Sequence, residues 1–98
     1  MLSTDVTVVA QLARVTEDGW QSSRQVPTFT IPHGVHGLVS LAHAAVIAAE
    51  ILATQTPKET EIILALSTPT SYGTATFIAD GNGSASFPGQ ASWHGPDS

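Results

Sequence analysis

The chain has 98 residues, the length of a single domain. Only 11% of the residues are charged, where an average domain has about 25%, and serine and threonine together number 22. Three basic residues against eight acidic ones give a net charge of −5, which argues against a nucleic-acid partner because phosphate backbones need clustered cations. Cysteine is absent, which excludes disulfides, zinc–thiolate sites and cysteine nucleophiles.

The first residues, Met1–Asp5, have no cationic region followed by an apolar block, so we expect no secretory signal and a cytoplasmic location. The most apolar stretch, Leu38–Ala53, contains His43 and Glu50 and is shorter than the roughly 20 residues that cross a bilayer. We therefore expect no membrane partner.

Two strands joined by a turn are predicted at the start of the chain. Residues 6–15 are apolar on both alternating faces, and Glu17-Asp18-Gly19 has the composition of a turn. The second strand is expected in two pieces, residues 20–25 and 28–31. Pro27 between them cannot donate to a strand ladder, so this strand should lie at a sheet edge or carry a bulge.

A helix is expected from near Val35 to just before Pro57. Positions three and four apart form an apolar stripe that should face the core, and the rest of the circumference is also largely apolar, as in a helix covered on more than one side. The stripe consists of Leu38, Leu41, Ala42, Ala45, Ala49 and Leu52.

Two further strands and a short third one are predicted after the helix. Residues 60–67 are apolar on both faces, which indicates a central strand with cover above and below. Residues 72–79 form the next strand, and Asp80-Gly81-Asn82-Gly83 has the composition of a hairpin turn leading to residues 84–87.

These elements predict an α+β fold, an antiparallel sheet of four to five strands with one long helix packed across it, in ββαββ-like order. Residues 1–88 would form the single domain. Residues 89–98, rich in glycine, proline and polar side chains, would be a flexible tail.

Self-association is expected because one helix can cover only one face of such a sheet, and large exposed apolar patches are uncommon in monomers. We expect a homodimer or a higher oligomer. Small residues at spacing four on the helix predict either a helix–helix seam or close packing on the chain's own sheet. The candidate interface residues are Ala45, Ala49, Ala53, Ile63 and Ala65.

A polar stripe on the predicted helix is the weaker candidate site. It consists of His36, Ser40, His43 and Glu50. A spacing of seven separates side chains by about 10.5 Å along a helix axis, too far for shared metal ligation or for a Ser-His-acid relay. We expect a solvated or interface edge here, with no catalytic residue, metal or cofactor.

Residues 17–20, then Thr28-Phe29-Thr30-Ile31 running into an alanine-rich helix at residues 44–50, resemble small accessory proteins of bacteriophages that infect actinobacteria. The resemblance covers about the first 55 residues and rests on pattern and composition. It implies a protein of a class whose functions are mostly unknown, some members of which bind and disturb host proteins. It carries over no functional residue.

Together these observations predict a non-enzymatic, oligomeric phage accessory protein that binds itself and a host protein. One alternative is a structural virion component, for which the same self-association would serve. The other is a small hydrolase or ligand-binding protein with a site near His36, Ser40 and His43.

Overall fold

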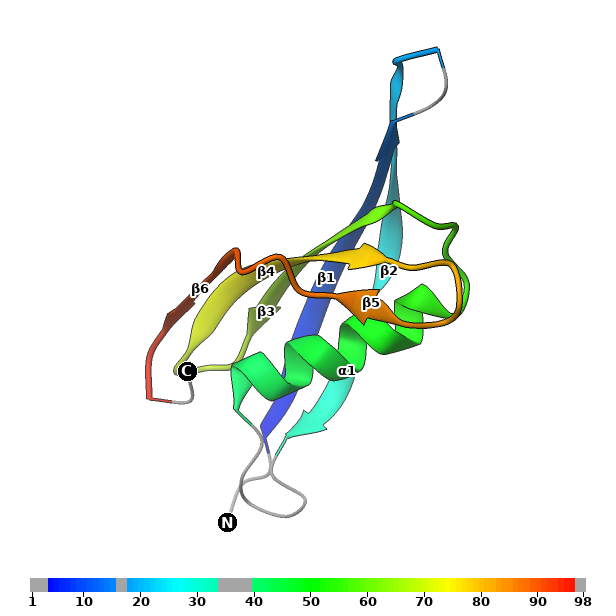
Figure 1. Cartoon of the computed structure of the whole chain (residues 1–98). Helices are drawn as coiled ribbons and strands as arrows, with labels where there is room; N and C mark the ends of the chain where they lie inside the picture. Colours follow the sequence, from blue (N-terminus) through cyan, green and yellow to red (C-terminus); the bar gives the residue numbers. More distant parts are fainter. Residues whose placement is uncertain (1–3, 16–17, 34–39, 97–98) are drawn as a thin grey trace.

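The computed structural model describes residues 4–15, 18–33 and 40–96. Within them the chain is α+β, with one helix packed against one face of an antiparallel sheet (Figure 1). The fold class predicted from the sequence is thus confirmed, and the sheet has six strands instead of four or five. In chain order the elements are β1 (Thr4–Val15), β2 (Gln21–His33), α1 (Leu41–Ala53), β3 (Glu61–Ser67), β4 (Tyr72–Ala79), β5 (Ala85–Ser86) and β6 (Ala91–His94).

The sheet order is β2-β1-β3-β4-β5, and β6 also pairs with β4. Strands β1 and β2 form a long hairpin that extends beyond the rest of the sheet (Figure 1). This hairpin gives the molecule its elongated shape, with extents of 51 × 24 × 22 Å.

Strand β2 is an edge strand and carries a bulge, as Pro27 predicts. The register pairs Val8 with Phe29 and Ala10 with Val26, so one residue of β1 lies opposite two residues of β2. The strand nevertheless continues through the bulge from Gln21 to His33, which corrects the expectation of two separate pieces.

The core lies between the sheet and α1. Alternate residues of β1, β3 and β4 point toward the helix, because successive side chains of a strand face opposite sides. Their buried members are Val6, Val8, Ala10, Leu12, Ile62, Leu64, Leu66, Ala75, Phe77 and Ala79.

The helix begins at Leu41, not near Val35. Ser40 has extended backbone angles (φ −79°, ψ 164°), and its hydroxyl oxygen accepts a hydrogen bond from the backbone N–H of His43 at 3.2 Å, as an N-cap does. Leu38 and Val35 lie outside the described residues. The helix ends at Ala53, three residues earlier than the limit that Pro57 sets.

The buried face of α1 is also rotated from the predicted stripe. Ala42 is exposed and Leu52 is only half-buried, whereas Ala44 and Ala48 are in the core. A helix with alanines around most of its circumference has no single apolar stripe strong enough to specify its rotation about its axis.

The connection after β4 is a hairpin in the predicted place, but its loop spans residues 80–84. The Asp80 carboxylate accepts hydrogen bonds from the backbone N–H groups of Asn82 (2.7 Å) and Ser84 (3.2 Å). Gly81 and Gly83 have positive φ, and Asn82 does not. The longer loop thus places its two glycines, rather than an Asn-Gly pair, at the left-handed positions.

The predicted tail, residues 89–98, contains a further strand at residues 91–94. These residues form β6, which pairs with the first half of β4, from Tyr72↔His94 to Ala75↔Ala91. Trp93 is half-buried against the core, and the ring of His94 stacks on Tyr72 at a centroid distance of 5.0 Å. Aromatic packing anchors a strand whose composition alone is typical of a loop.

Candidate functional sites

One side of the sheet is left uncovered by the helix. We call it the open face, and its centre is formed by the side chains of β1, β3 and β4 that point away from α1, together with two from β2. These central residues are Thr7, Val9, Gln11, Ser23, Gln25, Ile63, Ala65, Thr74 and Thr76.

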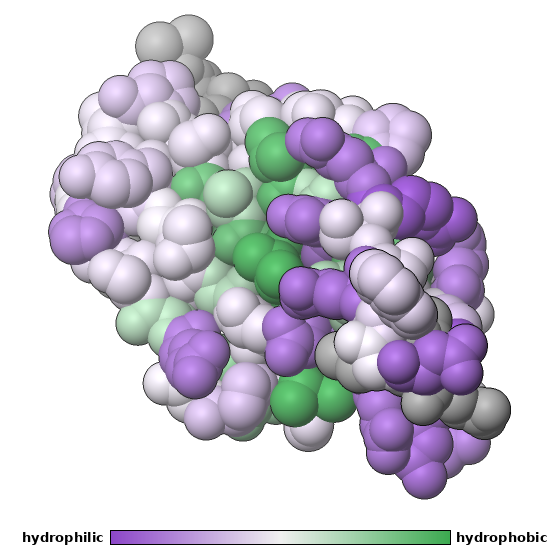
Figure 2. Space-filling model, turned by 90° about the horizontal axis from the view of Figure 1, so that it is seen from above, coloured by the Kyte–Doolittle hydropathy of each residue, from purple (hydrophilic) through white to green (hydrophobic). Residues whose placement is uncertain are grey.

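A hollow of about 440 Å³ lies at the centre of the open face. Val9 pairs with Ala65 and Gln11 with Ile63 across β1 and β3, and all four line it. Val9 is 38% exposed, and Ala65 is also exposed. Figure 2 looks down on the molecule from the end where the β1–β2 hairpin extends, and in that view hydrophobic residues form a central band with strongly hydrophilic residues concentrated on one side.

Charge is confined to the ends of the strands on this face. Among the described residues of β1 and β3, the acidic side chains that share the open face are Asp5 and Glu61, each near one end of its strand. The centre between them has only apolar, hydroxyl and amide side chains. Such a surface loses little hydration energy of charges when another protein covers it.

The predicted interface residues are divided by the structure. Ala45, Ala49 and Ala53 are 1%, 1% and 2% exposed and lie in the core against the chain's own sheet. Of the two interpretations, their burial favours close packing on the chain's own sheet over a helix–helix seam. Ile63 and Ala65 lie on the open face, where a partner could reach them.

The structure describes three of the four residues of the predicted polar stripe. Ser40 caps the helix, while His43 and Glu50 are exposed on its outer side, and His36 lies outside the described residues. No group of three or more histidine, aspartate or glutamate side chains among the described residues is placed to hold a metal ion.

A second hollow, which sequence analysis missed, lies on the opposite side of the sheet between the β1–β2 hairpin and the C-terminal end of α1. It consists of two adjoining cavities of about 270 and 350 Å³ that share Leu12, Arg24, Gln55 and Thr56. We call it the arginine groove, because both arginines of the chain, Arg14 and Arg24, line it.

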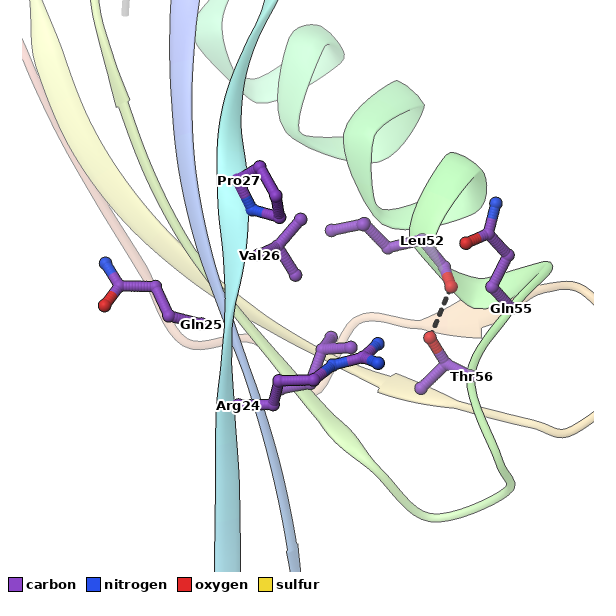
Figure 3. Close-up of a pocket in the computed structure, with 8 residues that line it drawn as sticks. Arg24, Gln25, Val26, Pro27, Leu52, Gln55 and Thr56 are labelled. Atoms are coloured by element: carbon purple, nitrogen blue, oxygen red, sulfur yellow. Dashed lines mark hydrogen bonds between the residues drawn. The ribbon is translucent and has the colours of Figure 1, made fainter.

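The alternation of β2 builds the arginine groove. Arg24 and Val26 point toward the helix, and Gln25 points away from it (Figure 3). On the other side, the Thr56 hydroxyl donates a hydrogen bond to the backbone carbonyl of Leu52 and closes the last turn of the helix. Sequence spacing could not have found this groove, because the two arginines come from different strands and meet Thr56 only through the tertiary fold.

Comparison with known proteins gives no relative: no family model, no curated protein and no solved structure matches the chain. In the described residues, no helix has both the length and the apolar character needed to cross a membrane. The geometry of the two hollows is therefore the basis for assigning a function.

Proposed function

We propose that this protein is a non-enzymatic binding module that joins a second copy of its own chain through the open face of the sheet. The observation that carries the proposal is the absence of charge at the centre of the open face, combined with its exposed apolar side chains Val9 and Ala65. Apolar surface of this kind is stabilised when it is removed from water.

The charge of the chain makes this face the best one for contact between copies. Each copy carries −5, so two copies repel each other wherever their carboxylates approach. The open face is the region where two copies can meet with their acidic side chains held at the edges of the contact. Twofold symmetry would place the same patch of each copy against the other.

The size of the sheet fits this role. A standard protein interface takes about 800 Å² from each partner, about an eighth of the 6179 Å² of accessible surface of this chain. Two sheets packed face to face, about 10 Å apart, can bury an area of that order. The resemblance to phage accessory proteins, some of which bind host proteins, supports a host protein as a further partner.

The test uses two variants with the same change of charge. Ala65 and Ala42 are both exposed alanines, on the open face and on the outer side of α1 respectively. We expect the wild type to be dimeric at micromolar concentration. We expect Ala65→Glu to weaken association by about a hundredfold or more, because like charges brought together in an interface cost several kcal/mol. Ala42→Glu should remain dimeric.

Sedimentation equilibrium measures all three proteins, and circular dichroism checks that each is folded. A monomeric wild type, or equal association of the two variants, would contradict self-association through the open face. Loss of dimers in Ala42→Glu alone would place the contact on the helix instead.

A further inference from the structure

We propose that the arginine groove binds a small organic carboxylate, with the carboxylate at Arg14 and Arg24 and a short apolar body toward Pro27. This site lies on the side of the sheet opposite the open face and is independent of the proposed self-association. The chemistry follows from the residues that line its two ends.

The cationic end concentrates most of the positive charge of an acidic chain. Of three basic residues in the sequence, two line this groove. Arg24 lies opposite Leu12, and Arg14 lies opposite Ser22, so the two arginines are diagonal neighbours on the same side of the hairpin. Diagonal neighbours are about 7–8 Å apart, close enough for two guanidinium groups to contact one anion. The planar guanidinium donates two parallel hydrogen bonds to a carboxylate.

The guanidinium groups are not neutralised within the described residues, where neither arginine has an ion pair. The helix end beside them does not need their donors either. The carbonyl of Ile51 accepts from the Thr54 hydroxyl at 2.7 Å, and that of Leu52 accepts from the Gln55 N–H at 3.1 Å. The carbonyl of Ala53 accepts from the Thr56 N–H. Both arginines can therefore direct their donors to a ligand.

A buried hydroxyl at the same end also lacks a partner. Thr60 lines the groove and is only 3% exposed, and its hydroxyl is the one buried side-chain polar atom among the described residues without a hydrogen bond. Most buried polar groups are hydrogen-bonded, and an unsatisfied one lowers the stability of the fold. Because Thr60 lines the groove, a carboxylate oxygen bound there could accept a hydrogen bond from this hydroxyl after rotation about the Cα–Cβ bond.

The other end of the groove is apolar. Val26 and Pro27 line it from β2, and Leu52 lines it from the helix (Figure 3). Leu12 of β1 also lines it. An inorganic anion would leave this end unfilled. A carboxylate with a chain of a few carbon atoms would fill it and bury apolar surface.

The test is a titration of the protein with hexanoate, butanoate, hexanamide and inorganic phosphate, followed by NMR shifts of the backbone amides. We expect hexanoate to bind more tightly than butanoate by about three- to fourfold for each methylene that is buried. Hexanamide, which has the same chain without the charge, should bind at least tenfold more weakly. Equal binding of hexanoate and phosphate would overturn the apolar part of the site, and equal binding of hexanoate and hexanamide would overturn the arginine part.

Two variants with the same loss of charge distinguish binding in the groove from a general attraction of hexanoate to positive charge. Arg24→Gln and Lys58→Gln remove one positive charge each, and Lys58 lies outside the groove, against the Gly81 turn. We expect Arg24→Gln to weaken hexanoate binding at least tenfold and Lys58→Gln to change it less than twofold. Equal losses would overturn the proposal.

Thr60→Val provides a second readout because it keeps the shape of the side chain and removes the hydroxyl. We expect a higher melting temperature and several-fold weaker hexanoate binding, and an unchanged affinity would remove Thr60 from the site.

Arginine and proline on an edge strand also discourage pairing with other chains. If that were their whole role, no carboxylate would bind, and Arg24→Gln would only increase aggregation. The Ala65→Glu variant should bind hexanoate as the wild type does, so failure of the dimer and failure of the groove are distinguishable.

Discussion

At the scale of single residues, Gly73 is a position with no room for added volume. It pairs with Trp93 across β4 and β6, and a Cβ atom there would lie 2.3 Å from the ring carbon Cε3 of Trp93 and 2.4 Å from the backbone oxygen of Ser92. Real Cβ atoms do not approach other atoms so closely, and one of these contacts is with backbone. Gly73 therefore leaves the space that the indole of Trp93 occupies beside the core.

We predict that Gly73→Ala displaces β6 and lowers stability by about 1–3 kcal/mol, the usual cost of overpacking. Gln90→Ala, at an exposed position just before β6, should change stability by less than about 0.5 kcal/mol. Urea unfolding measures both. Trp93 fluorescence, recorded in a Trp20→Phe background, should shift to the red in Gly73→Ala. An unshifted spectrum would mean that the indole stays in place.

At the scale of elements, the start of α1 depends on one side chain. Ser40 supplies the cap, and no acidic residue in the first turn assists it. We predict that Ser40→Ala lowers stability by about 1 kcal/mol, which corresponds to about 4–8 °C in melting temperature for a domain of this size. Ser40→Asp should be at least as stable as the wild type, since a carboxylate caps and also interacts favourably with the helix dipole. All proteins are compared at one concentration, because dimers add stability. Equal melting temperatures for Ala and Asp would show that the cap contributes little.

The elements also differ in how far the sequence predicts them. Strands β3 and β4 have alternating or continuous apolar patterns and turn residues at both ends, and they occur where predicted. The predicted start of the helix is wrong because its true cap, Ser40, is a lone serine without the glutamate of a capping box, and the sequence pattern therefore does not mark it. Strand β6 is missed because its pairing depends on the space over Gly73, which only the folded sheet creates. Of the candidate interface, the two strand residues reach the surface, whereas the alanines of the helix are in the core.

At the scale of the whole molecule, the low and asymmetric charge predicts that salt has opposite effects on the two proposed sites. It should strengthen dimerisation and weaken carboxylate binding. Two copies of net charge −5 repel each other over long distances, and the contact that we propose has no ion pairs at its centre to compensate. The screening length falls from about 30 Å at 0.01 M salt to about 8 Å at 0.15 M. Sodium chloride should therefore strengthen dimerisation over this range, because it screens the repulsion and leaves apolar contact intact.

Carboxylate binding in the arginine groove should respond in the opposite sense, because there salt screens an attraction between unlike charges. Sedimentation equilibrium and the hexanoate titration, each performed at 0.01 M and 0.15 M sodium chloride on the same protein preparation, measure the two effects. Dimers that weaken as salt increases would indicate an interface built on ion pairs and would move it from the open face to the charged strand ends. Hexanoate binding that is insensitive to salt would indicate that the apolar end of the groove, and not the arginines, provides the affinity.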